Sequence, residues 1–251
     1  MIKIQKYLQQ LGYSRRKADE MVFDGKVEVN GKIIKEPWYD VKEKDEIKIN
    51  GKSRIVKFRK KYVYCVLNKP KGYVSSLYDP KEKKTLKNLL KNIKEPLKPA
   101  GRLDKDVTGV LILTNDGDLI NVLTSAKYGI EKIYIVKVKG SVKKEELKKL
   151  KRGFEDNGEF LICKDVSILE KGFDYTILKI VMIKGKKHEV KRLFKHIGHK
   201  VLELKRISHG PIDISLVPRP GQLEKIEGKI LEKLLELKNT KPKKNSKNKI
   251  T

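Results

Sequence analysis

The sequence has few cysteines and no long apolar run. Its 251 residues include two cysteines, Cys65 and Cys163, which do not form a Cys-x-x-Cys pair. Such sparse cysteine favours a reducing cytosol over a disulfide-stabilised scaffold. No apolar stretch approaches the roughly 20 residues that a membrane-spanning helix needs, and the first residues lack the apolar region of a signal peptide. We therefore expect a cytoplasmic protein with no membrane partner.

Acidic residues are scarce relative to basic ones, with 32 Asp and Glu against 60 Lys and Arg. The formal net charge of +28 exceeds what solubility requires and predicts salt-sensitive binding to a phosphate backbone. An anionic membrane surface and a general preference for lysine are alternative explanations, and lysine greatly outnumbers arginine here. The charge favours nucleic acid as the partner.

Residues 1–50 show the pattern of a small domain. Apolar residues recur at helical spacing from Ile4 to Leu11, and Ser14 is a suitable N-cap for a second helix. Asn30-Gly31 separates two short apolar runs and predicts a β-hairpin with a type I′ turn. Residues 51–61 carry many charges and little core material, so we expect a linker there.

Residues 62–237 combine apolar, β-branched runs with amphipathic segments. Strands and helices that are interspersed without regular repetition favour an α+β fold. From residue 238 to residue 251 the chain has six lysines and no acidic residue, which predicts a disordered tail that attracts phosphate. The predicted strands are residues 64–67, 110–113, 132–139 and 175–183, and the predicted helices are residues 85–92, 118–123, 145–151 and 189–197.

Three cations in succession, Arg15, Arg16 and Lys17, follow Ser14 at the predicted start of the second helix. Cations there oppose the helix dipole, and a phosphate bound by them and by the free N–H groups would compensate. A solvated basic face is the alternative. Together with the order helix, helix, hairpin, the segment resembles the S4-type RNA-binding domain of ribosomal protein S4. The resemblance implies that RNA is bound by Ser14, Arg15, Arg16, Lys17 and Asn30.

Asp104 lies in a polar loop, directly before an apolar strand that ends in an Asn-Asp-Gly turn. Arg102 supplies positive charge that favours the ionised carboxylate, and two flanking glycines allow close approach of a ligand. An ionised carboxylate at a strand end can serve as nucleophile or base. A plain turn aspartate is the alternative, and the residues alone leave both interpretations open. Asp106 and Asp116 are weaker candidates for such a role.

The string Gly-Arg-Leu-Asp-x-x-x-Thr-Gly at residues 101–109, with the aliphatic strand and Thr-Asn-Asp-Gly after it, resembles the signature of RNA pseudouridine synthases. The version here is similar to the RsuA/RluB branch, which modifies ribosomal RNA. The resemblance implies an S4-type domain at residues 1–50 and a catalytic domain at residues 62–237, with a mixed, mainly antiparallel central sheet flanked by helices. It also implies that Asp104 is the catalytic residue that converts a flipped uridine to pseudouridine.

Tyr134 lies in a strand-like segment, residues 131–136, that is similar to the Lys-x-Tyr strand of this family. Alternation along the strand indicates a core aromatic. The resemblance instead implies a catalytic-site ring that stacks on the flipped uracil. In residues 201–206, which resemble the closing segment of the family, Leu204 would form the apolar wall of the uracil pocket.

Residues 185–194 resemble the family segment that supplies a cation beside the catalytic aspartate, and Lys191 matches that cation. The resemblance also implies RNA contacts by Arg102, Lys186, His188 and Arg192, whereas the alternative is an ordinary solvated helix face. Lys186 stands where Arg is usual and cannot copy the planar Arg fork. Glu189, in the same segment, stands where Gln is frequent.

The remaining expectations concern roles outside the chemistry. Lys69, in a Lys-Pro-Lys-Gly string similar to the first family motif, should have a structural or phosphate-contact role. We expect neither a carboxylate nor a third ligand beside His196 and His199, so we expect no metal site, and the reaction implied needs no cofactor. We expect a monomer that binds ribosomal RNA. A non-catalytic RNA-binding or ribosome-assembly factor is the alternative, and the sequence leaves the target uridine and the ribosomal subunit open.

Overall fold

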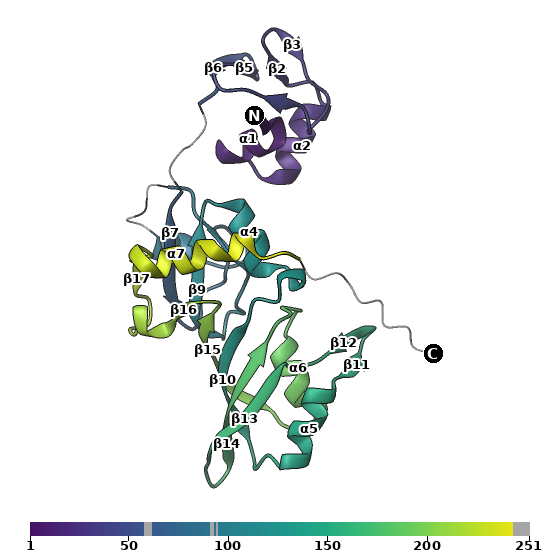
Figure 1. Cartoon of the computed structure of the whole chain (residues 1–251), viewed down its shortest axis with the longest axis vertical. Coiled ribbons are helices and arrows are strands. Elements are labelled where there is room, and N and C mark those ends of the chain that lie inside the picture. The colour runs from purple at the N-terminus through teal and green to yellow at the C-terminus, as the bar shows by residue number, and fades with distance from the viewer. Residues whose placement is uncertain (58–61, 91–92, 94, 243–251) are drawn as a thin grey trace. The chain divides into compact units, whose positions relative to one another are not determined.

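The computed structural model describes residues 1–57, 62–90, 93 and 95–242, and its contacts divide the chain into two units, residues 1–62 and 63–251. Each unit has its own hydrophobic core. Figure 1 shows both units as ribbons with their elements labelled. Among the described residues, no helix is long and apolar enough to cross a membrane.

The first unit packs two helices against small sheets. Ser14 caps the second helix as predicted, since its Oγ accepts a hydrogen bond from the Lys17 backbone N–H at 3.1 Å. The predicted hairpin turn is confirmed by the positive φ angles of Asn30 (50°) and Gly31 (78°). The helices of the first unit are α1 (Ile4–Gln10) and α2 (Arg15–Phe23). Its strands form a sheet of β3 (Lys32–Ile33), β2 (Val27–Val29), β5 (Glu46–Ile49) and β6 (Lys52–Ile55), and the pair β1 (Ile2–Lys3) and β4 (Asp40–Val41).

The predicted linker is wrong in its first half. Residues 52–55 form β6, which pairs with β5 along its whole length, and Val56 is fully buried in the core of the first unit. The side chains of β6 are exposed, so its sequence resembles a linker although its backbone belongs to the sheet. Residues 58–61 of the predicted linker lie outside the described residues.

A mixed sheet forms the centre of the second unit and confirms the predicted α+β class. Its strands are antiparallel except at one junction, where β15 and β9 run parallel. The strand order is β13 (Asp165–Lys171), β14 (Tyr175–Met182), β10 (Lys132–Lys139), β15 (Val201–His209), β9 (Thr108–Thr114), β7 (Tyr64–Lys69) and β17 (Leu223–Lys225), with β8 (Lys98–Pro99) beside β9 and β16 (Ile212–Asp213) beside β15.

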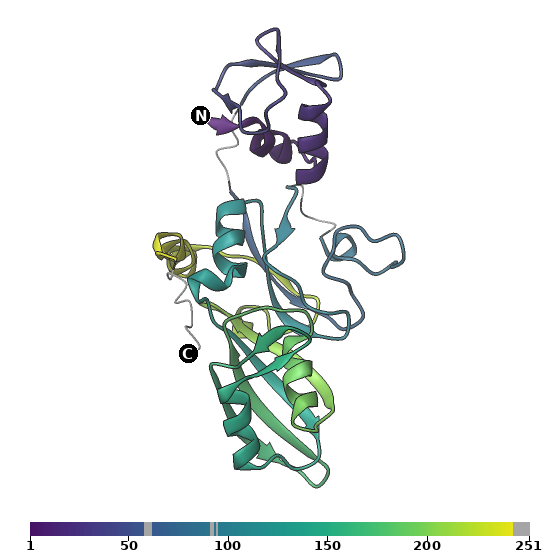
Figure 2. The same ribbon diagram turned by 90° about the vertical axis from the view of Figure 1, so that its right-hand side faces the viewer.

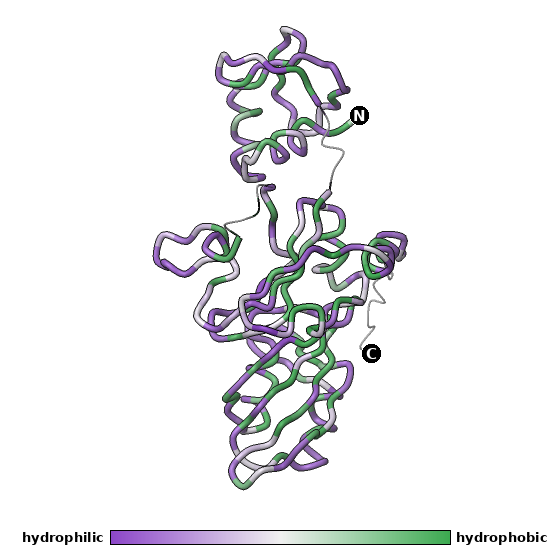
Figure 3. The backbone as a smooth tube through the Cα atoms, turned by 90° about the vertical axis from the view of Figure 1, so that its left-hand side faces the viewer, coloured by the Kyte–Doolittle hydropathy of each residue, from purple (hydrophilic) through white to green (hydrophobic). Residues whose placement is uncertain are grey.

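Helices cover both faces of this sheet because its central strands are apolar on both sides. In β9, Val110 and Ile112 join the core beneath α4 (Gly117–Thr124) and α7 (Gly228–Glu236), whereas Leu111 and Leu113 join the opposite core. Figures 1 and 2 show α4 and α7 side by side, and Figure 3 shows the hydrophobic stretches of the chain in green. The opposite core includes residues of α3 (Leu86–Leu89), α5 (Lys144–Arg152) and α6 (Glu189–His196), near the hairpin of β11 (Phe154–Asp156) and β12 (Glu159–Leu161).

The first residues of the predicted disordered tail are ordered in the structure. The 3-10 helix η3 (Leu237–Asn239) follows α7, and the Lys238 ammonium lies 3.0 Å from the buried carboxylate of Asp116. Asp116 is the N-cap of α4, because its Oδ1 accepts hydrogen bonds from the backbone N–H groups of Asp118 and Leu119. A buried carboxylate needs such partners, which places Lys238 in the fold. Residues 243–251 of the predicted tail lie outside the described residues.

Candidate active site

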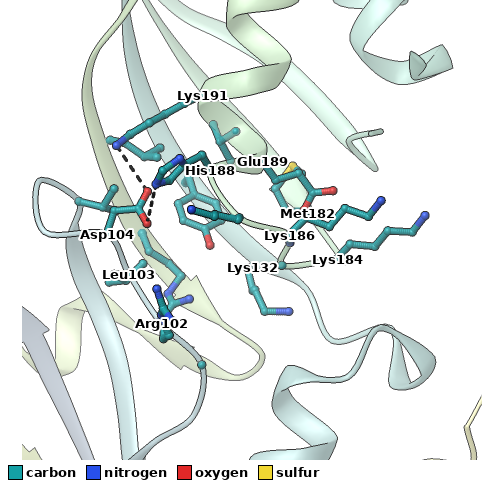
Figure 4. A pocket seen from close by; sticks show the side chains of 18 of the residues that line it. Arg102, Leu103, Asp104, Lys132, Met182, Lys184, Lys186, His188, Glu189 and Lys191 are labelled. Atoms are coloured by element: carbon teal, nitrogen blue, oxygen red, sulfur yellow. Dashed lines mark hydrogen bonds and ion pairs between the residues drawn. The ribbon is translucent and has the colours of Figure 1, made fainter. Parts of the chain in front are cut away.

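A pocket of about 380 Å³ lies in the second unit, where the loop before β9 meets β10, β15 and the start of α6. Figure 4 shows the side chains that line it. Seven of the residues singled out from the sequence lie here although they are far apart in the chain, namely Arg102, Asp104, Tyr134, Lys186, His188, Lys191 and Leu204.

Two local features fix Asp104 at the edge of this pocket. Ser75 Oγ donates to the Leu103 carbonyl at 2.7 Å and accepts from the Leu103 N–H at 3.0 Å, which clamps the loop one residue before Asp104. The Val107 N–H then bonds to the Asp104 carbonyl at 3.1 Å and closes a turn. The Asp104 side chain is thus held at a rigid position with 28% of its surface exposed.

The Lys191 ammonium and the His188 imidazole face the Asp104 carboxylate. Its Oδ1 lies 3.5 Å from His188 Nε2, and its Oδ2 lies 3.4 Å from Lys191 Nζ, as the dashed lines in Figure 4 show. His188 has a left-handed backbone (φ 52°) at the start of α6, a conformation that is uncommon for a residue with a side chain. That turn directs the imidazole toward Asp104 instead of along the helix.

Lys191 also binds a second carboxylate, that of Asp106. The ammonium donates to both Asp106 oxygens, at 2.7 and 2.9 Å. Burial acts to raise the pKa of Asp106, but the hydrogen bond and charge of Lys191 hold that pKa below its usual value. The Lys191 ammonium therefore pairs with two carboxylates of the same loop, those of Asp104 and Asp106.

Tyr134 belongs both to the core and to the pocket, so neither predicted role excludes the other. The residue is 9% exposed and packs with the core on the α6 side of the sheet, and its ring lines the cavity. The Arg206 guanidinium lies 6.0 Å from the ring centroid, and its Nε donates to the Val110 carbonyl at 2.7 Å. Leu204, also 9% exposed, adds an apolar surface beside the ring.

Three buried polar residues of the pocket, Lys132, Glu189 and Arg206, had no predicted role. Lys132 Nζ donates to the backbone carbonyls of Ile130 and Ile183, and burial lowers the pKa of Lys132 to about 8. Glu189 is 4% exposed, and burial raises its pKa even though its Oε2 accepts from the Lys186 N–H. Strand alternation contained the signal, because Lys132 shares a face with Tyr134, and Arg206 shares a face with Leu204.

Two predicted RNA-binding residues have structural contacts. Lys69 is fully buried and donates to the Pro70 and Tyr73 carbonyls, and burial lowers its pKa to about 8. This burial and these contacts fit the structural alternative, and the RNA contact of Lys69 stays a prediction. The Arg192 guanidinium binds the carboxylates of Asp156 and Glu159 in the β11–β12 hairpin and does not line the pocket.

In the first unit, all the predicted RNA-binding residues are exposed, and two of them also make structural contacts. Ser14 caps α2, and Asn30 accepts from the Glu46 N–H at 2.8 Å and donates to the Asp45 carboxylate at 3.1 Å. Arg15, Arg16 and Lys17 are exposed, with Lys17 paired to Glu20 on the same helix. The exposed cations remain predicted RNA contacts.

The two histidines of α6 and its following turn have separate partners. His196 stacks on Phe154, with ring centroids 3.4 Å apart and an interplanar angle of 8°. His199 lies 3.3 Å from a Glu146 oxygen, so a carboxylate does accompany this histidine, contrary to expectation. Within the described part of the chain, no cluster of three or more His, Cys, Asp or Glu side chains could hold a metal ion.

The fold and the pocket are those of an RNA-modifying enzyme, and comparison with known families makes this specific. Residues 63–196 match the RNA pseudouridylate synthase family, and residues 2–47 match the S4 domain. The chain therefore belongs to the RNA pseudouridylate synthase family, whose members are isomerases, and it carries an N-terminal S4 domain.

Individual relatives agree with this assignment. The chain is 40% identical to ribosomal large subunit pseudouridine synthase B of Bacillus subtilis (strain 168), over 82% of this chain and 84% of that protein. It is 30% identical to ribosomal small subunit pseudouridine synthase A of Escherichia coli (strain K12), over 88% of this chain and 94% of that protein. A crystal structure of a pseudouridylate synthase superposes with a TM-score of 0.62 at 28% identity and covers 93% of this chain and all of that one.

Proposed function

We propose that this protein converts a specific uridine of ribosomal RNA to pseudouridine, with Asp104 as the catalytic residue. The observation that carries the proposal is the position of Asp104, an accessible carboxylate beside the Lys191 ammonium and the His188 imidazole at the edge of a pocket that Tyr134 lines. Relatives named as large-subunit and small-subunit ribosomal enzymes support ribosomal RNA as the substrate class.

The size of the pocket supports a uridine that has left its RNA helix. A cavity of about 380 Å³ has the size of a small-molecule site and admits a nucleoside but not a duplex. Enzymes that act on a base extrude it into such a pocket and stack it on aromatic or apolar side chains. Tyr134 and Leu204 provide those surfaces, while Arg102 and Lys186 supply cations for the neighbouring phosphates.

Two first steps are open to Asp104, namely attack on ribose C1′ and removal of the proton from C2′. Both need an ionised carboxylate, whose oxygens lie 3.4 Å from the Lys191 ammonium and 3.5 Å from His188 Nε2. On either route the bond from C1′ to uracil N1 breaks, the base turns, and C1′ bonds to C5. On the first route the bond between Asp104 and C1′ breaks as the new bond forms, and on the second route Asp104 returns the proton to C2′. N1 gains a proton and C5 loses one, so the product is an isomer of the substrate and no redox cofactor takes part.

Replacement of Asp104 by Asn tests this role. Asp104→Asn keeps the shape but removes the charge and the nucleophilic oxygen, so we expect pseudouridine formation to fall by on the order of 10²–10⁴-fold. Release of tritium from ribosomal RNA labelled at uridine C5 measures the rate, and a filter assay checks that RNA binding is kept. Asp174→Asn, an exposed aspartate on the β13–β14 turn, is the matched control.

Substantial turnover by Asp104→Asn would refute the assignment. A wild-type protein that binds ribosomal RNA but forms no pseudouridine would favour the non-catalytic assembly factor. The target uridine can be mapped by carbodiimide-dependent primer extension on ribosomal RNA from cells with and without the gene. Sedimentation and cell fractionation test the expected monomer and the cytoplasmic location.

A further inference from the structure

We propose that Asp106 is a positioning residue that holds the Lys191 ammonium away from the Asp104 carboxylate, so that Asp104 keeps its lone pairs for the reaction. This inference rests on the proposed function of Asp104. Asp106 does not line the pocket, and its side chain is 58% exposed, so it acts through Lys191 and not on the substrate.

The distances around Lys191 show an unequal division between the two carboxylates. Its Nζ lies 2.7 and 2.9 Å from the Asp106 oxygens, within the usual range for a hydrogen bond. The distance to Asp104 Oδ2 is 3.4 Å, and His188 stands 3.5 Å from Oδ1. Among the described residues, Asp104 thus has two contacts at long distance, whereas Asp106 receives the short, direct hydrogen bonds of Lys191.

The loop geometry makes this division possible. Asp104 and Asp106 are two residues apart, and the turn closed by the Val107 N–H on the Asp104 carbonyl brings both carboxylates to α6. Lys191 projects from the first turn of α6 and reaches both. One lysine of the pocket lining thereby joins the loop to the helix.

A chemical reason connects this arrangement to the rate. A carboxylate that attacks C1′ or removes a proton must first give up any hydrogen bond on the reacting oxygen, and bonds from an ammonium are among the strong ones. At 3.4 Å, the Lys191 ammonium still places its positive charge beside Asp104 without a short hydrogen bond to the reacting oxygen. Asp106 therefore keeps the positive charge of Lys191 near Asp104 and prevents the hydrogen bond that would block the reacting oxygen.

Replacement of Asp106 by Asn gives the primary test. Without the second carboxylate, Lys191 moves onto Asp104, and we expect the single-turnover rate at saturating RNA to fall about tenfold. The KM for a ribosomal RNA fragment should change by less than about twofold, because Asp106 does not line the pocket. Asp106→Glu should recover most of the rate, and Asp174→Asn, which removes an exposed charge elsewhere, should have the wild-type rate.

A double-mutant cycle tests whether the effect passes through Lys191. In a Lys191→Met background, which lowers the rate by itself, the further change Asp106→Asn should have no additional effect. An unchanged rate for Asp106→Asn, an effect on KM alone, an increased rate, or an equal loss in the Lys191→Met background would each overturn the proposal. Melting temperatures within a few degrees of the wild type confirm that the variants fold.

The two proposals fail separately. Turnover by Asp104→Asn would refute the catalytic role of Asp104, and this inference with it. An inactive Asp104→Asn together with a fully active Asp106→Asn would refute only the role of Asp106.

Discussion

At the scale of single residues, the pocket holds a carboxyl group, Glu189, in surroundings that disfavour its charge. Its Oε1 has no hydrogen-bond partner in the described part of the chain, and burial raises the pKa of Glu189 against the charges of Lys186 and Lys184. The folded state therefore holds this proton more tightly than the unfolded chain, whose pKa is near 4.5. By linkage, the contribution of Glu189 to stability falls as pH rises from that value through the raised pKa of the folded state.

Replacement of Glu189 by Gln should remove this pH dependence. The variant cannot ionise, so at pH 8 we expect a free energy of unfolding about 1 kcal/mol above that of the wild type, and at pH 4 no such gain. Urea unfolding at the two pH values measures the difference. Glu155→Gln, an exposed glutamate on β11, controls for the change in net charge. A gain of equal size at both pH values would contradict the explanation.

At the same scale, the motifs predicted most of the pocket, but burial could not be read from them. The spacing around Asp104 and the resemblance of residues 185–194 pointed to residues that the structure brings together. Lys69 also lies in a motif, yet it is fully buried, because three backbone carbonyls lie around its ammonium. Nothing in the local pattern distinguishes such a lysine from one that contacts phosphate.

At the scale of elements, the junction of β9 and β15 joins the two parts of the central sheet. It is parallel and short, with Gly109 opposite Arg206 and Thr108 opposite Lys205. A Cβ at Gly109 would lie 2.0 Å from the Arg206 carbonyl oxygen, and the glycine φ of 106° is unfavourable for any other residue. Because Gly109 has no side chain, β9 can lie against β15, and this pairing positions β9 and the Asp104 loop before it.

Replacement of Gly109 by Ala should therefore separate the two strands. Because the clash is with backbone and not with a flexible side chain, we expect a loss of about 4 kcal/mol or more in the free energy of unfolding. Gly117→Ala is the matched control, since Gly117 lies in α4 with open space at its Cβ and should be neutral or slightly stabilising. Thermal melting by circular dichroism compares the two, and similar melting temperatures would contradict the prediction.

The elements that were predicted are those in which apolar residues recur with a regular period. The strand over residues 132–139 is confirmed as β10, and α6 lies within the predicted helix at residues 189–197. The strands β13 and β15 were not predicted as strands. The pairing of β13 with β14 has a register shift between Ile168 and Glu170, and the pairing of β15 with β10 has register shifts as well. Such irregularities move a side chain to the other face and break the alternation on which prediction depends.

At the scale of the whole molecule, the excess of basic residues should dominate RNA affinity. A net charge of +28 predicts that the logarithm of the association constant falls linearly with the logarithm of salt concentration. Arg15, Arg16 and Lys17 are exposed at the start of α2 and are expected to contribute. The pocket lies in the second unit, whereas these cations lie in the first.

Replacement of these three cations by Ala should reduce the salt dependence of binding. If each contacts one phosphate, the slope decreases by about 2–3, because each neutralised phosphate contributes about 0.7–0.9. Fluorescence anisotropy with a labelled ribosomal RNA fragment, at several salt concentrations, measures the slope. Arg15→Lys with Arg16→Lys keeps the charge and should keep the slope, and an unchanged slope in the Ala variant would exclude this surface as a phosphate contact.

The sequence by itself determined the basic character, the order of the two domains, the regular elements and the identity of Asp104 as a candidate, because each is encoded by residues close together in the chain. Only the tertiary structure decided that Lys191 is shared between Asp104 and Asp106, that Lys69 and Glu189 are buried, and that Lys238 belongs to the fold. These outcomes depend on contacts between segments far apart in sequence. Burial and charge pairing arise from such contacts, and they decide which of many similar lysines and carboxylates face the pocket.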